Sequence, residues 1–264
     1  MGARVFVALG LVGVALLVVP PTASSQSIDD RVGEVDDGEV RMSFAAKPGV
    51  CGDGEGTIST DGGRGWHVRH GDDDWEATCE YGPVRVVLTV RDKEVTKVRA
   101  YVGGRWRSPS RTTVDLGTVS APQASDYLLM LARRSGNDAG EEAILPAMLA
   151  DSSTVWPDLL DMARDESLRH DTRKSAVFWL SQVASEAATA GLEEIVDDED
   201  EDREVRKTAV FALSQRPNDE GVPALIQVAR NSQDGAIRKQ ALFWLGQSED
   251  PRAIALFEEI LTRR

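Results

Sequence analysis

The residues with the clearest potential for metal chemistry are two histidines followed by three acids. His67 and His70 precede Asp72–Asp74, and imidazole and carboxylate groups are common metal ligands. In an extended, hairpin-like segment, however, residues three apart point to opposite faces of the chain. We therefore expect no metal at this position, and a shared metal site is the alternative.

Six consecutive acids, Asp197–Asp202, are the other group of possible metal ligands. The run lacks the glycine turn and the closing glutamate of a calcium-binding loop, so we expect a solvated loop between helices. The sequence also lacks G-x-G-x-x-G, G-K-[ST], G-x-S-x-G and H-E-x-x-H, which are typical of nucleotide-binding proteins, serine hydrolases and zinc proteases. We therefore predict no catalytic residue, no cofactor and no bound metal.

Residues 1–25 have the layout of a signal peptide. Arg4 precedes an uninterrupted apolar or glycine run, Val5–Val19, which as a helix would be about 22 Å long, shorter than the roughly 30 Å hydrocarbon core of a bilayer. Small residues precede a possible cut before Gln26, as a signal peptidase requires. We expect a bacterial protein that is exported to the periplasm or cell envelope, with no membrane span in the mature chain. An uncleaved anchor is the alternative.

Export bears on the two cysteines of the chain, Cys51 and Cys79. In an oxidising compartment an isolated pair is most simply a structural disulfide. The alternative is a redox-active pair, but the C-x-x-C spacing that such pairs usually have is absent. Closing a loop of about 29 residues would stabilise the fold by roughly 3–4 kcal/mol in the chain-entropy model.

The charge of the chain limits the class of its partner. Lys and Arg number 30 and Asp and Glu 44, which gives a formal net charge of −14 at pH 7. Loss of residues 1–25 would remove one base and leave 29 bases against 44 acids. The acids concentrate in residues 121–264, which hold 27 acids and 16 bases. Because phosphate backbones require a basic face, we predict that the chain does not bind nucleic acid.

The first half of the chain predicts a small, mostly antiparallel β module over residues 40–120. Apolar residues alternate along 84–90, a turn follows at 92–94, and a second strand-like run covers 95–102, which together predict a hairpin. The weaker strand candidates are Met42–Phe44, Gly65–Val68 and Val114–Leu116. Residues 26–39 are polar and acidic without a period, and we expect them to form a flexible lead-in.

From Ala121 onward the period becomes helical and the chain repeats itself. The block R-K-x-A-[VL]-F-[WA]-L-[SG]-Q begins at Arg173, Arg206 and Arg238, at offsets of 33 and 32 residues. A second apolar helix recurs after each block on the same spacing. A degenerate first repeat covers about 139–166, and a further helix at 123–134 would cap it. Such repetition indicates an α-solenoid, so we predict an α+β protein in which residues 121–264 form a cap helix and about four helix pairs.

The repeated block and the helix after it resemble HEAT repeats, and most nearly the short bacterial type of phycobilisome-lyase-like proteins. The resemblance covers about 140–264. That family includes bilin lyases and an iron-dependent deoxyhypusine hydroxylase beside many binding scaffolds. The hydroxylase type carries His-Glu pairs as iron ligands, whereas the solenoid here holds one histidine, His170, followed by Asp171. The resemblance therefore implies a HEAT-like solenoid that binds a protein, with lyase- or oxidoreductase-like chemistry as an alternative.

Two faces of the repeated helix differ in their expected roles. Ala176, Trp179 and Leu180 share the face that we expect in the core, and the arginine that begins each block is expected in a stacked polar ladder. The opposite face carries a lysine, a phenylalanine and a glutamine in each repeat. We call this face the stripe; its members are Lys174, Phe178, Gln182, Lys207, Phe211, Gln215, Lys239, Phe243 and Gln247. Its rings are either exposed to a partner or packed between neighbouring repeats.

These patterns together predict an exported, non-enzymatic scaffold that binds a protein partner through its solenoid. Two other functions stay open: a family-type enzyme, and recognition of a cell-envelope ligand by the β module. For the latter, Trp66, Trp75 and Trp106 are the possible platform aromatics.

Overall fold

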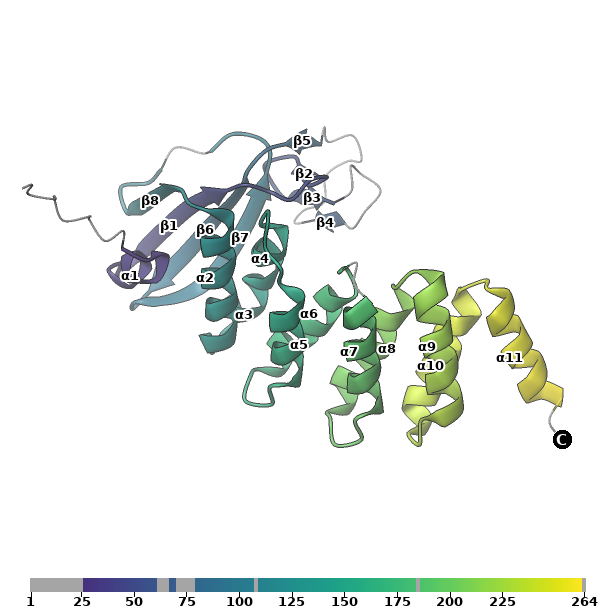
Figure 1. Cartoon of the computed structure of the whole chain (residues 1–264). Helices are drawn as coiled ribbons and strands as arrows, with labels where there is room; N and C mark the ends of the chain where they lie inside the picture. Colours follow the sequence, from purple (N-terminus) through teal and green to yellow (C-terminus); the bar gives the residue numbers. More distant parts are fainter. Residues whose placement is uncertain (1–25, 61–66, 70–78, 107–108, 184–185, 263–264) are drawn as a thin grey trace, which may run out of the picture.

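The computed structural model describes residues 26–60, 67–69, 79–106, 109–183 and 186–262. Strands fill the first part of this range, and a row of helices follows (Figure 1). The predicted α+β class, with a solenoid at the carboxyl-terminal side of a β region, is confirmed.

The main sheet has four strands in the order β7-β6-β1-β8. They are β1 (Gly38–Phe44), β6 (Val84–Arg91), β7 (Glu94–Val102) and β8 (Thr113–Thr118). The β1–β6 and β6–β7 pairs are antiparallel, and β8 pairs with β1 in parallel. Every second residue of β6 is buried, as its alternation predicted. Asp92 and Lys93 both have positive φ, 49° and 65°, which is the backbone that a tight two-residue hairpin requires.

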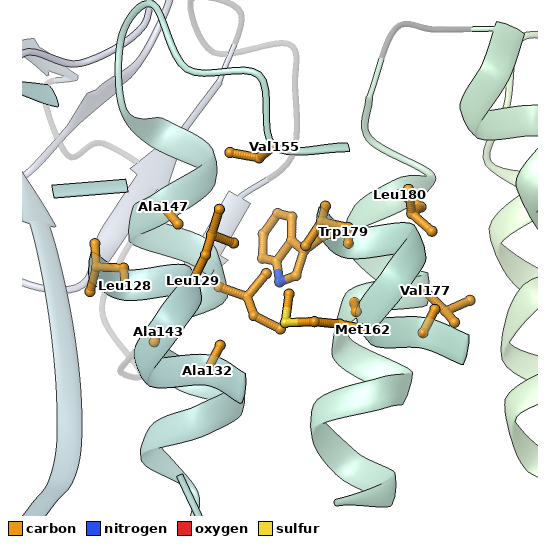
Figure 2. Packing of buried hydrophobic residues seen from close by; sticks show 14 of the residues in the cluster. Leu128, Leu129, Ala132, Ala143, Ala147, Val155, Met162, Val177, Trp179 and Leu180 are labelled. Atoms are coloured by element: carbon orange, nitrogen blue, oxygen red, sulfur yellow. The ribbon is translucent and has the colours of Figure 1, made fainter. Parts of the chain in front are cut away.

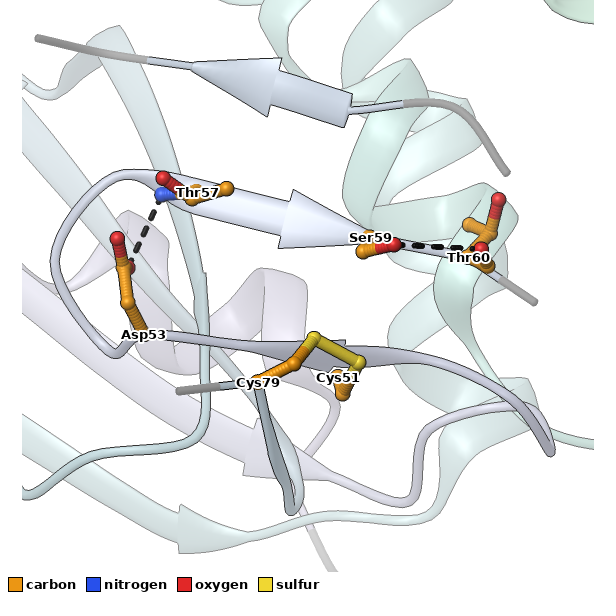
Figure 3. Close-up of a disulfide and its surroundings, with 6 residues drawn as sticks. All are labelled: Cys51, Asp53, Thr57, Ser59, Thr60 and Cys79. Carbon is orange, nitrogen blue, oxygen red and sulfur yellow. Dashed lines mark hydrogen bonds between the residues drawn. A yellow bond between two sulfur atoms is a disulfide. The ribbon is translucent and has the colours of Figure 1, made fainter. Parts of the chain in front are cut away.

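A second, smaller sheet carries the disulfide. Its antiparallel strands have the order β4-β3-β2-β5 and are β2 (Cys51–Gly52), β3 (Thr57–Ser59), β4 (His67–Arg69) and β5 (Glu80–Tyr81). The Cys51–Cys79 disulfide, with 5.2 Å between the Cα atoms, joins β2 to the residue that precedes β5 (Figure 3). The predicted disulfide is thus present in the structure. The strands of this small sheet have two or three residues each, too few to form a hydrophobic core of their own. The disulfide therefore adds stability that packing within the sheet does not provide.

The turn before β3 is organised by one carboxylate. Asp53 accepts hydrogen bonds from the backbone N–H groups of Glu55, Gly56 and Thr57 at 2.8, 2.9 and 3.0 Å; Figure 3 shows the one from Thr57. Burial acts to raise the pKa of Asp53, but these donors outweigh burial and hold that pKa below its usual value.

Residues 26–39, expected as a flexible lead-in, instead contain a helix, α1 (Ile28–Gly33). Ser27 and Asp30 form a reciprocal capping box at its start. Val32 is 3% exposed and packs into the core, and Asp29 pairs with Arg134 at 2.6 Å. The sequence did not indicate this helix, because it is short, lies in an acidic segment and buries only one apolar side chain, Val32.

The first helices pack directly on the main sheet. They are α2 (Ala121–Arg134), α3 (Ala139–Glu142) and α4 (Ile144–Leu149). Two backbone hydrogen bonds extend this contact: Lys47 N–H donates to the Leu149 carbonyl at 2.8 Å, and Asp151 N–H to the Ala45 carbonyl at 2.9 Å. Buried residues of the sheet and of the helices belong to one continuous hydrophobic cluster. The β module and the solenoid therefore share a core.

The remaining helices form two layers (Figure 1). They are α5 (Trp156–Arg164), α6 (His170–Leu180), α7 (Glu186–Asp197), α8 (Arg203–Ser214), α9 (Asn218–Asn231), α10 (Gly235–Gln247) and α11 (Pro251–Thr262). Helices α6, α8 and α10 contact one another in one layer, and α5, α7, α9 and α11 do so in the other. The repeated block occupies the first layer, and the second apolar helix of each repeat occupies the other.

The layers are held together by the residues that the helical period assigned to the core. Ala176 and Leu180 are fully buried and Trp179 is 8% exposed. Trp179 lies beside Leu129 and Met162, between the first helices of the row (Figure 2). Interiors of this kind are close-packed, so the loss of one such side chain leaves a cavity.

Candidate functional site

The stripe predicted on the repeated helix lies along the layer formed by α6, α8 and α10. Its members differ in exposure. The half-buried members are Lys174, Phe178, Lys207 and Phe211, and the exposed members are Gln182, Gln215, Lys239, Phe243 and Gln247. The stripe is thus fully exposed only in the last of its three repeats.

The aromatic rings of this layer form a row that crosses three repeats. Phe178 stacks on Phe211 with 6.3 Å between ring centroids and an interplanar angle of 8°. Phe211 in turn contacts Trp244 at 5.2 Å, and Trp244 meets Phe243 edge-on at 5.0 Å. Phe178 and Phe211 are therefore packed between neighbouring repeats. Phe243 is 57% exposed and ends the row at the surface.

The lysines of the stripe have unequal electrostatic surroundings. Lys207 pairs with Glu204 one helical turn away, with 2.7 Å between Nζ and Oε1. Gln240 of the next repeat donates to the carbonyl of Lys207 at 2.9 Å. Lys174 and Lys239 have no carboxylate within ion-pair distance among the described residues. Along the stripe, Lys207 is thus neutralised by Glu204, whereas the lysines of the repeats on either side, Lys174 and Lys239, are not paired with a described carboxylate.

In the first two blocks, the arginine that begins the block forms the expected polar ladder. Arg173 donates from Nε to the carbonyl of Ala163 at 3.0 Å, and Arg206 does the same to Val196 at 2.9 Å. These carbonyls lie at the carboxyl-terminal ends of α5 and α7, where a cation also meets the negative end of the helix dipole. Arg238 departs from this pattern and is only half-buried.

The acidic run between α7 and α8 is more than the solvated loop that its composition predicted. Glu201 is 9% exposed and forms an ion pair with the buried Arg173 of the preceding repeat. Asp202 caps α8 by accepting from the backbone N–H groups of Glu204 and Val205, and it also bonds His170 at 2.9 Å. A compositional run could not reveal which of its acids contact a neighbouring repeat.

Sequence reasoning also missed a buried arginine that belongs to one repeat alone. Arg216 is 5% exposed; it donates to the Thr189 hydroxyl at 2.8 Å and to a Glu220 carboxylate oxygen at 2.7 Å. The Thr189 hydroxyl and the Arg216 guanidinium hold the pKa of Glu220 below its usual value. The corresponding block positions hold Val183 and Ser248, so the repeat pattern gave no signal.

The β module presents one of its three candidate aromatics within the described range. Trp106 lies beneath the guanidinium groups of Arg41 and Arg85, at 5.0 and 5.7 Å from the ring centroid. Trp66 and Trp75 lie outside the described residues. So do His70 and Asp72–Asp74 of the metal alternative.

Comparison with known families agrees with the geometry of the helix pairs. Residues 198–264 match the family model for HEAT repeats. The matched residues include helices α8 to α11. The helix pairs that precede them stack in the same two layers. The HEAT-repeat prediction is confirmed for residues 198–264. No curated protein matches the chain. None of the helices in the described ranges is long and apolar enough to cross a bilayer.

Proposed function

We propose that this chain is an exported, non-enzymatic scaffold whose HEAT repeats bind a protein partner along the stripe. HEAT repeats commonly mediate protein interactions, because each stacked repeat adds contact area to one extended surface. We also propose that the repeats are of the short bacterial type found in phycobilisome-lyase-like proteins, with binding rather than lyase chemistry as their role.

The observation that carries the proposal is the continuous row of rings along α6, α8 and α10. Aromatic side chains are frequent anchors of protein interfaces, and the Phe178–Phe211 stack fixes their positions before a partner arrives. Phe243, more than half exposed, offers the largest apolar contact. Lys174 and Lys239 flank the row without carboxylate partners in the described part of the chain, which favours acidic side chains on the partner.

The test reverses the two uncompensated charges of the stripe. A Lys174→Glu/Lys239→Glu variant should lose partner binding about tenfold or more, while its stability stays within roughly 0.5 kcal/mol of the parent because both changes lie at the surface. The binding partner is first captured from envelope extract by the parent protein, and its affinity is then measured by titration at low and high salt.

The matched control is Lys93→Glu/Lys97→Glu, which makes the same charge change at two exposed positions of the β module. This control should bind the partner as the parent does. Equal affinity of the stripe variant and the parent would contradict the proposal. A stripe-dependent affinity should also weaken with salt, because exposed charges are screened.

Export and the disulfide are tested together by the intact mass of protein recovered from outside the cytoplasm. We expect the mass of residues 26–264 less two hydrogens, with no thiol that reacts with an alkylating reagent before reduction. A recovered protein that retains Val5–Val19 would show a membrane anchor instead. Two reactive thiols at Cys51 and Cys79 would contradict the disulfide in the exported form.

A further inference from the structure

A second charged surface lies on the β module, which the proposed function leaves without a role. The main sheet buries one face under the helices and turns the other toward solvent. On that outer face is a cavity of about 320 Å³, large enough for a small organic ligand. Four arginines line it: Arg41, Arg85, Arg99 and Arg105.

Strand register explains why three of these arginines gather in one place. Val87 of β6 pairs with Arg41 of β1 on one side and with Arg99 of β7 on the other. Directly opposed residues on one face of a sheet have Cβ atoms roughly 5 Å apart. Arg85 lies two residues before Val87 on the same strand and therefore on the same face. The outer face thus carries three guanidinium groups around one valine.

Two of the arginines are held in place by contacts that leave the cavity open. Arg41 pairs with Asp115 at 2.6 Å and lies over Trp106. Arg85 donates from one terminal nitrogen to the carbonyls of Gly103 and Gly104, which fixes the loop that carries Trp106. The Nε of Arg85 is buried and has no hydrogen-bond partner among the described residues. A buried donor of this kind is costly unless an acceptor is supplied.

The other arginines supply uncompensated charge. In the described ranges, no carboxylate lies within ion-pair distance of Arg85, Arg99 or Arg105, and the last two are exposed. Two carboxylates, Glu39 and Glu55, are among the described residues that line the cavity, and Asp115 pairs with Arg41 beside it, so the four arginines exceed these acids by one. This local excess of positive charge stands in a chain of net charge −14.

We propose that this cavity binds a carboxylate group carried by a small organic ligand or by an acidic side chain of a protein. Guanidinium groups match the planar geometry of carboxylates and bind them through paired hydrogen bonds. A carboxylate in the cavity would meet the exposed Arg99 and Arg105, with Arg85 as a further lining cation. Trp106 and Val87 provide apolar surface for the body of the ligand. A net excess of one positive charge suits a single carboxylate better than a highly charged polyphosphate.

The experiment titrates the purified, disulfide-bonded protein with four probes at low ionic strength: benzoate, citrate, a hexa-aspartate peptide and inorganic phosphate. We expect saturable binding of at least one carboxylate probe, weakened by salt. An Arg99→Gln/Arg105→Gln variant should bind that probe about tenfold more weakly or worse. It should fold normally, because both side chains are exposed. The control Arg111→Gln removes an exposed arginine of the same module outside the cavity, and its affinity should equal that of the parent.

The probes distinguish the two sources of the carboxylate. Tightest binding of citrate or benzoate indicates a free small ligand, and tightest binding of hexa-aspartate indicates an acidic segment of a protein. The proposal is overturned if no carboxylate probe binds saturably, if phosphate alone binds, or if Arg111→Gln weakens binding as much as the cavity variant does. None of these results depends on the lysines of the stripe, so the cavity and the solenoid proposals fail or stand separately.

Discussion

The arginine that begins the repeated block occupies two different environments in one solenoid. Arg173 and Arg206 are 5% and 6% exposed and bond the carbonyl end of the preceding helix. Arg238, at the same position of the last block, is half-buried and bonds the loop carbonyls of Ser232 and Gln233 at 2.7 and 3.0 Å. Equal sequence does not produce equal burial, because in a solenoid each residue is covered by its neighbouring repeats.

The apolar side chains show the same contrast. Val228 of α9 has a repeat on either side and is 3% exposed, whereas Ile260, 32 residues later in α11, is 46% exposed. Ile254 and Leu261 of α11 are 54% and 83% exposed. A repeat in the middle of the row therefore contributes more to stability than the last one does, even where the residue types agree.

The largest expected effect comes from breaking the polar ladder in the middle of the row. Arg173→Ala leaves the carboxylate of Glu201 buried without its cation, which costs about 3–5 kcal/mol for pairs of this kind. Arg238→Ala should cost no more than about 1.5 kcal/mol, because water can replace its contacts. Urea denaturation followed by circular dichroism measures both free energies of unfolding. Equal losses would show that burial by neighbouring repeats does not set the strength of the ladder.

A cavity in the same region should have a slightly smaller effect. Leu213→Ala should reduce the free energy of unfolding by about 2–5 kcal/mol. Leu261→Ala should change it by roughly 0.5 kcal/mol or less. Hydrogen exchange can locate the loss, which should appear in α8 to α11 before it reaches the sheet. Uniform loss of protection across the chain would contradict the expected repeat-by-repeat unfolding.

The smallest effect tests a helix cap. Asp202→Ala should cost about 1 kcal/mol at pH 7. The hydrogen bond from His170, together with two backbone N–H groups, holds the pKa of Asp202 below its usual value despite the opposing effect of desolvation. A lowered pKa gives stability that is complete above the pKa of the unfolded chain, about 4, and is lost as the pH falls through the folded value. The difference in Tm between parent and variant should thus be constant from pH 7 to pH 5 and shrink below about pH 4. A constant difference at pH 3 would argue against the cap.

The features that could be predicted from sequence are those encoded locally or by repetition. The offset of 33 residues located the helix pairs, and the alternation of residues 84–90 located the hairpin. The short helix α1 was missed because its signal is a single capping box, Ser27 with Asp30, within an acidic segment. The partner of Glu201 was missed because one acid in a run of six cannot be distinguished by composition.

The arginine cavity could not be predicted for a different reason. Arg41 and Arg99 lie far apart in the chain, and only the register of β1 and β7 with Val87 brings them together. The register of strands so distant follows from the fold as a whole, which a linear pattern does not contain. The stripe is intermediate: its residues were predicted from spacing, but the Phe211–Trp244 contact that continues the ring row needed the stacked repeats.

The core shared by the main sheet and helices α2 to α4 gives the molecule the mechanics of a cantilever. A hinge between the two modules would require this core to open, so the first repeats cannot pivot on the sheet. Each later repeat is held mainly by its nearest neighbours. A force applied to the end of the row is therefore carried from one interface between repeats to the next. A pull on α11 would therefore separate the distal interfaces first, while the end clamped to the sheet stays in place.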